Sequence, residues 1–150
     1  MSATISTLSD ITLTTLEGCP ADIGYLASSL DTIAQLGVNI DMISMAPAHG
    51  DLTAFSLTIS DDDLGKVLTF TKKLRETTSV QPIVSSGNYK ISVYDPRMKN
   101  TPGIAAAVFA AAARVSADIR LISTSDVEIS MLVTAADYDS ALSELEAALG

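Results

Sequence analysis

The chain has 150 residues, of which 47% are hydrophobic and 18% are charged, and this composition excludes a disordered protein. Nine basic and eighteen acidic residues give a net charge of −9, which disfavours nucleic acid and anionic membranes as partners because both would repel the chain. A single cysteine excludes an internal disulfide, and no signal-peptide pattern is visible, so we expect a soluble cytoplasmic protein.

The first half of the chain begins with an alternation of strand and helix signals. Residues 11–16 have a strand pattern, and glycine and proline within 17–20 are predicted to end that strand. Apolar residues at helical spacing follow over 23–34. A dense apolar run then predicts a buried strand over 38–45, and the alternation over 55–59 predicts a third strand.

Acidic residues next mark the start of a second helix. Residues 60–63 carry a serine and three aspartates, which favour a helix N-terminus, and apolar residues at helical spacing run from Leu64 to Leu74. Residues 80–84 form one more short strand. The order β-α-β-β-α-β is typical of a ferredoxin-like sandwich, in which two helices cover one face of an antiparallel sheet.

The second half of the chain repeats this order. Gly24 returns as Gly103 and Asn39 returns as Asp118, both 79 positions later. No fourth strand follows the last predicted helix, so we expect the segment 3–8 to complete the second copy. The predicted elements of the second copy are strands over 89–94, 117–123 and 127–135 and helices over 101–116 and 137–149.

These patterns predict an α+β protein built from two ferredoxin-like βαββαβ modules with antiparallel sheets and helices on one face. The first module is expected over residues 9–86 and the second over 87–150, interleaved with the first through the strand 3–8. Each module would bury only about 60% of its unfolded surface. We therefore expect the modules to pack against each other or against a second copy of the chain.

Three segments resemble a known family. Residues 98–105 read Met-Lys-Asn-Thr-Pro-Gly-Ile-Ala, residues 121–130 read Leu-Ile-Ser-Thr-Ser-Asp-Val-Glu-Ile-Ser, and residues 38–43 read Val-Asn-Ile-Asp-Met-Ile. In these segments the halves resemble paired ACT domains, in particular the regulatory region of aspartokinases and the small regulatory subunit of heteromeric aspartokinases. The resemblance implies an allosteric protein without a kinase domain that binds lysine or threonine, or both, at contacts between ACT domains. It also implies a homodimer, and an aspartokinase catalytic chain as a further partner.

A free amino acid presents a carboxylate and an ammonium within one small head group. The turn over 100–104 enters a helix whose first N–H groups lack intrahelical partners, which suits a carboxylate. Hydroxyls and one acid over 123–126 follow the neighbouring strand, and the resemblance implies Asp41 as the partner of the ammonium. The predicted effector-binding residues are Asp22, Gly24, Asn39, Ile40, Asp41, Met98, Asn100, Thr101, Gly103, Ile104, Ala105, Ser123, Thr124, Ser125 and Asp126.

Two departures from the family pattern leave alternatives open. The first copy has Asp22-Ile23-Gly24 where the family usually has an Asp followed closely by Pro-Gly, and Arg120 takes the place of Asp41 in the second copy. One alternative is a constitutive assembly subunit that has lost ligand binding. Another is a small enzyme on a ferredoxin-like scaffold, because fold alone does not fix function. No acid–base constellation supports that enzyme, and we predict no catalytic residue, metal site or cofactor.

Overall fold

The computed structural model describes residues 3–149 and divides the chain into two compact units. The N-terminal unit comprises residues 10–86, and the C-terminal unit comprises residues 3–9 together with 87–149. The elements in chain order are β1 (Thr4–Pro20), α1 (Ile23–Gln35), β2 (Ile43–Met45), β3 (Leu52–Ser60), η1 (Asp61–Asp63), α2 (Leu64–Thr77), β4 (Gln81–Tyr94), η2 (Pro96–Lys99), α3 (Ile104–Arg114), β5 (Ile119–Thr124), β6 (Glu128–Val133) and α4 (Ala135–Leu149).

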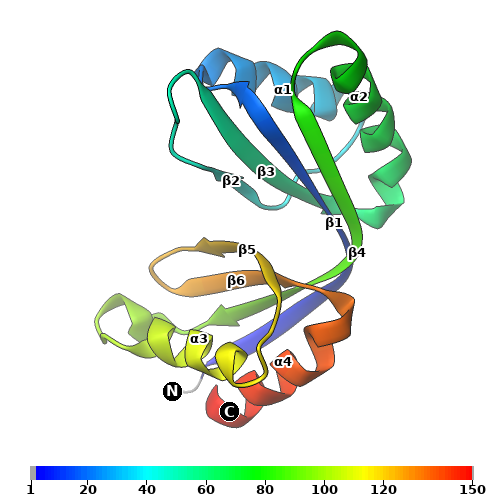
Figure 1. The fold of residues 1–150 in the computed structure, drawn as a ribbon. Helices are drawn as coiled ribbons and strands as arrows, with labels where there is room; N and C mark the ends of the chain where they lie inside the picture. Colours follow the sequence, from blue (N-terminus) through cyan, green and yellow to red (C-terminus); the bar gives the residue numbers. More distant parts are fainter. Residues whose placement is uncertain (1–2, 150) are drawn as a thin grey trace. The chain divides into compact units, whose positions relative to one another are not determined.

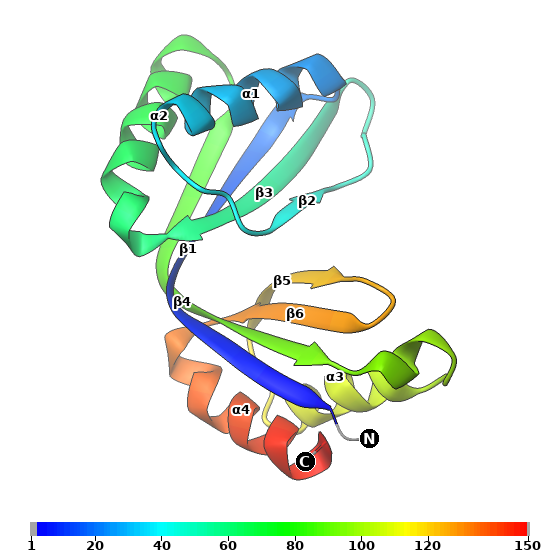
Figure 2. The same ribbon diagram turned by 180° about the vertical axis from the view of Figure 1, so that it is seen from behind.

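The long strands β1 and β4 contribute to both units. The strand order is β2-β3-β1-β4-β6-β5, so the N-terminal unit contains β2-β3-β1-β4 and the C-terminal unit contains β1-β4-β6-β5. The pairs β1–β3, β2–β3, β4–β6 and β5–β6 are antiparallel. Figures 1 and 2 show α1 and α2 on one face of the first sheet, and α3 and α4 on one face of the second. The predicted α+β, ferredoxin-like class is confirmed.

The core of the N-terminal unit lies between its sheet and its two helices. Leu16 on β1 pairs with Phe55 on β3, and both side chains are almost fully buried. Ile33 of α1 and Val67 of α2 complete this core from the helix side. Full burial of such a side chain contributes about 1.5–3 kcal/mol, so this alternation of apolar residues holds the helices on the sheet.

The core of the C-terminal unit is built in the same way with smaller helix residues. Ile91 on β4 pairs with Met131 on β6, and both are buried against α3 and α4. Ala111 of α3 and Leu145 of α4 are fully buried in this core. None of the helices within residues 3–149 is long and apolar enough to cross a membrane.

The predicted break of the first strand at 17–20 is wrong. β1 continues to Pro20, and a register shift between Leu16 and Cys19 absorbs the irregular residues. Gly18 has a φ of 68°, the left-handed conformation that glycine adopts readily in a bulge. The Cys19 thiol is buried beside the carbonyl oxygen of Thr53 at 3.3 Å, and burial raises the pKa of the thiol.

Two other strand predictions also differ from the structure. The strand predicted over 38–45 is confined to Ile43–Met45, because Val38 closes the end of α1 and the Met42 N–H donates to the Thr58 hydroxyl. The strands predicted over 80–84 and 89–94 are one continuous strand, β4. Within the run 38–45, Val38 and Met42 are buried outside the strand, whereas Ile43 and Met45 in the strand are exposed, so the prediction of a buried strand is wrong there. The polar stretch between the two apolar segments of β4 did not interrupt that strand.

Candidate functional site

The predicted carboxylate site lies at the start of α3 in the C-terminal unit. Gly103 is the N-cap residue with a φ of 95°, and its carbonyl accepts from the Ala107 N–H at 3.0 Å. No side chain among the described residues caps this helix end. The N–H groups of Ile104 and Ala105 belong to the first turn, where a helix has no carbonyl partners of its own. The start of α3 therefore offers donors and a positive helix dipole to an anion.

A short helix positions this turn. The loop between β4 and α3 contains η2, whose last N–H bonds run from Asn100 and Thr101 to the carbonyl of Arg97 at 3.2 and 2.8 Å. Met98 lies within η2, and its N–H donates to the Asp95 carbonyl at 3.1 Å. The predicted residues from Met98 to Ala105 are thus brought together in one connected turn, although α3 starts at Ile104 and not at residue 101.

The turn between β5 and β6 holds the second predicted group. The Ser125 hydroxyl accepts from the N–H groups of Val127 and Glu128, both at 3.2 Å, so it caps the turn. Ser123 and Thr124 belong to β5, and Asp126 lies at the tip.

Two contacts connect this turn with the residues before α3. The Asp95 N–H donates to the Val127 carbonyl at 2.8 Å. The Lys99 ammonium lies 3.8 Å from the Asp126 carboxylate. The structure therefore places the two predicted groups of the C-terminal unit at the same end of its sheet.

The helix α1 differs at its start from α3. Asp22 is the N-cap residue, and its carboxylate accepts from the Gly24 N–H at 3.0 Å. A Cβ at Gly24 would lie 3.3 Å from this carboxylate. The carboxylate of Asp22 thus accepts from the first turn of its own helix, while the equivalent end of α3 has no such cap.

The other predicted residues of the first copy lie in the connection between α1 and β2. Asn39, Ile40 and Asp41 belong to no strand, and the Asp41 N–H donates to the Thr58 carbonyl at 2.9 Å. The Asp41 side chain is exposed. These residues belong to the N-terminal unit, whereas the turn before α3 belongs to the C-terminal unit.

Residues 83–149 match the ACT domain family. The segment 83–149 is called the ACT domain after the family that it matches. The chain is also similar to the aspartokinase of Bacillus sp. (strain MGA3), which is 28% identical over 140 residues, or 93% of this chain and 34% of that protein. The chain therefore spans about a third of the length of the curated relatives that it matches.

Solved structures extend the similarity to the whole chain. The regulatory subunit of aspartate kinase from Thermus flavus is 25% identical, with a TM-score of 0.87, and the match covers 99% of both chains. The ligand-free regulatory subunit from Thermus thermophilus shows the same fold, with a TM-score of 0.89 over 100% of both chains and 24% identity. The resemblance of the sequence to ACT domains of aspartokinases is confirmed, and the described residues contain no kinase domain.

The ACT domain contains a buried acid that sequence reasoning missed. Asp95 is fully buried, and its carboxylate accepts from the backbone N–H of Arg97 at 2.9 Å. It also accepts from the Arg97 guanidinium, with distances of 3.0 Å from Nε and 2.6 Å from Nη2. These hydrogen bonds from Arg97 lower the pKa of Asp95. An Asp-Pro-Arg sequence directly after a strand is a turn signal that could have identified the pair.

The residue of the ACT domain that corresponds to Asp41 is Arg120, which forms an ion pair with Asp118. Arg120 on β5 donates to the Asp118 carboxylate at 2.9 Å, and both side chains are about half exposed. The Asp118 N–H in turn donates to the Asp137 carboxylate at 2.8 Å. The ACT domain therefore carries a cation where the first copy carries an acid, and the two copies do not present the same chemistry.

We expect Asp95→Asn to lower the stability of the ACT domain in a pH-dependent way. The folded pKa of Asp95 is lowered, so its ionised form stabilises the fold above the unfolded pKa of about 3.9. This contribution is lost as the pH falls through the lowered folded pKa. The difference in unfolding free energy between wild type and variant should thus be largest and constant above about pH 5 and shrink below about pH 4.

Urea titrations between pH 2.5 and 7 measure this difference. Asp139→Asn is the matched control, because it removes the same charge from an exposed position on α4. A stability difference for Asp95→Asn that stays constant down to pH 2.5 would contradict the role assigned to the ionised carboxylate.

Proposed function

We propose that this chain is an allosteric regulatory protein that binds a free amino acid, with lysine and threonine as the candidate effectors. We further propose that it acts as a homodimer and that an aspartokinase catalytic chain is its partner. The uncapped start of α3, next to the turn between β5 and β6, is the observation that carries this proposal. The 25% identity to a regulatory subunit of aspartate kinase over the full chain supports it.

The effector carboxylate is proposed to bind at the start of α3. The N–H groups of Gly103, Ile104 and Ala105 would donate to it, and a helix N-terminus adds about 0.3–1 kcal/mol for a negative charge. Gly103 has open space where a side chain would begin, because a Cβ there would meet nothing within 4 Å. A ligand can therefore approach the backbone closely at this residue. The hydroxyls of Ser123 and Thr124 are proposed as further partners.

Asp41 is the proposed partner of the effector ammonium. A charge-assisted hydrogen bond of this kind contributes about 1.5–3 kcal/mol when it is partly buried. The ACT domain has Arg120 at the equivalent position, so its own strand lacks this acid. We propose that Asn39 and Ile40 contact the effector beside Asp41.

Regulation would follow from differential binding. If the effector binds one arrangement of the ACT modules more tightly than another, it shifts the population toward that arrangement. If the catalytic partner also binds the two arrangements with different affinity, the effector changes the affinity for the partner. The free energy that couples the two binding events is typically about 1–3 kcal/mol.

The test is a thermal-unfolding panel of the purified chain with each common amino acid at millimolar concentration. A ligand at 100 times its Kd adds about 2.7 kcal/mol and raises the Tm by several degrees. We expect a selective increase with lysine or threonine that is reduced in Asp41→Ala. Asp51→Ala is the matched control, because Asp51 is an exposed acid of the same unit at a hairpin turn. An equal increase in wild type and Asp41→Ala would remove Asp41 from the site.

A constitutive assembly subunit is the second candidate function. The self-capped start of α1 and the Arg120–Asp118 pair favour it, because both occupy positions where an effector would bind. A panel in which no amino acid changes the Tm would support this second function over the first.

A further inference from the structure

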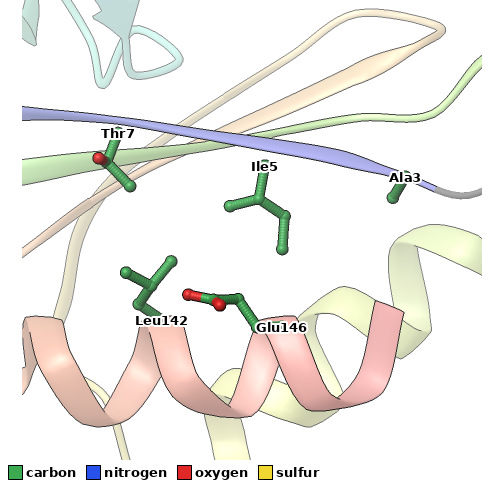
Figure 3. A pocket seen from close by; sticks show the side chains of 5 residues that line it. All are labelled: Ala3, Ile5, Thr7, Leu142 and Glu146. Carbon is green, nitrogen blue, oxygen red and sulfur yellow. The ribbon is translucent and has the colours of Figure 1, made fainter. Parts of the chain in front are cut away.

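A cavity of about 470 Å³ lies in the C-terminal unit between the first residues of β1 and the last turns of α4. Figure 3 shows Ala3, Ile5 and Thr7 directed from the strand toward the helix, and Leu142 and Glu146 directed from the helix toward the strand. The cavity is separate from the start of α3, where none of its lining residues lies.

The periodicity of the two elements explains why these side chains face each other. Ile5 and Thr7 share one face of β1 because side chains alternate along a strand, and Ala3, the residue before the strand, is directed to the same side. Leu142 and Glu146 are four residues apart and therefore lie on one face of α4. Tyr138, one turn earlier on that face, stacks on Tyr89 with ring centroids 4.0 Å apart.

The end of the interface near Glu146 is less filled. Ala3 and Ile5 pack against the core as partly buried residues, and the Ala3 methyl group is too small to reach across to the helix. Within this unit β1 is the outermost strand of the sheet, so no further strand fills the space on that side. One turn earlier on α4 the aromatic pair of Tyr138 and Tyr89 fills the space between helix and sheet. No such pair fills it near Glu146, and the cavity remains there.

The lining combines three apolar side chains with one hydroxyl and one acid. Ile5 and Leu142 form aliphatic walls, and Figure 3 shows the Glu146 carboxylate below Ile5, between the strand and the helix. Thr7 adds a hydroxyl at the other end. Among residues 3–149 no cation forms an ion pair with Glu146, and the chain as a whole has a net charge of −9. The cavity thus favours a positively charged ligand with an apolar body.

We propose that this cavity binds a small organic cation: a primary ammonium group attached to a short aliphatic chain. The ammonium would donate to the Glu146 carboxylate, and the aliphatic chain would lie between Ile5 and Leu142. A metal ion fits less well, because no group of three metal-ligating side chains occurs in the described part of the chain. An anionic ligand would be repelled by Glu146.

The test uses the full ¹⁵N-labelled chain at pH 7 and three probes of equal length: 1-butylamine, 1-butanol and butyrate. We expect saturable amide shifts at Ile5, Thr7 and Leu142 with butylamine, at least tenfold weaker binding of butanol, and no saturable shift with butyrate. Glu146→Gln should weaken the binding of butylamine about tenfold, the usual effect of a hydrogen bond to a charged group.

Glu144→Gln is the matched control, since Glu144 lies on the same helix but pairs with Arg114 at 2.9 Å. It should leave the affinity for butylamine unchanged. The proposal is overturned if butylamine gives no saturable shift at these residues, if butanol or butyrate binds as tightly, or if Glu146→Gln and Glu144→Gln have equal effects. Since Glu146 is exposed, its replacement should not unfold the chain, and the dispersion of the amide spectrum verifies this.

Discussion

Gly103→Val is expected to abolish amino-acid binding at the start of α3 and to destabilise the ACT domain by about 1–3 kcal/mol. Gly103 has a φ of 95°, a conformation that a β-branched side chain adopts only with strain. Space is not the cause, because a Cβ at this position would meet no atom within 4 Å. We expect the backbone of the variant to move and so relieve this strain. The N–H groups of Ile104 and Ala105 would then no longer point together toward the proposed carboxylate site.

Isothermal titration with the effector and urea unfolding measure the two expected effects. Gly65→Val is the matched control, because Gly65 lies in the first turn of α2 and also has open space around its Cβ position. Its backbone is helical, and valine is a better helix former than glycine, so this control should keep or slightly raise the stability. If Gly103→Val folds and binds like the wild type, the proposed carboxylate site is misplaced.

The fold class could be predicted because local patterns and the tertiary structure agree. Residues 55–59 alternate in the sequence, and the structure buries Phe55, Leu57 and Ile59 on the helix face of β3. The helix predicted over 23–34 is α1 with one further residue. Where the period of apolar residues is clear, it determines which face is buried, and burial determines the layers.

Irregular backbone could not be predicted in the same way. The apolar run over 38–45 has the composition of a buried strand, yet Val38 and Met42 are buried in a connection. The Thr58 hydroxyl accepts from the Met42 N–H, so a side chain replaces a ladder bond there. This hydrogen bond joins residues 16 positions apart, so no local sequence pattern predicts it.

In the candidate site, too, some features follow from the local sequence and others depend on the tertiary structure. The sequence predicts Asp22 as an effector-site residue, and the structure shows that its carboxylate caps α1 by accepting from the Gly24 N–H; its place before an apolar helical pattern is a signal of such a cap. The bidentate pair of Asp95 and Arg97 was not foreseen, because Asp95 is tied by its N–H to the carbonyl of Val127, 32 positions away along the chain. Local capping is therefore readable from a sequence, whereas the burial of a charged group depends on the tertiary structure.

Phe55→Ala is expected to lower the stability of the N-terminal unit by about 3–5 kcal/mol, the usual cost of removing a buried aromatic ring. Phe55 is 1% exposed and packs in a core with Leu16, Ile33 and Val67. The cavity that remains cannot collapse easily, because strand β3 is paired on both sides, with β1 and with β2. Urea unfolding followed by far-ultraviolet circular dichroism measures the loss.

Leu52→Ala on the same strand is the control for Phe55→Ala, because Leu52 is 49% exposed and its truncation should change the stability by at most about 0.5 kcal/mol. The two cores share no residue, so amide hydrogen exchange should accelerate more at Leu57 in β3 than at Met131 in β6. A loss below about 1 kcal/mol for Phe55→Ala would contradict the close packing of this core. In that case the apolar alternation of β3 would be a signal of strand formation alone, and the helices α1 and α2 would be held to the sheet by other contacts.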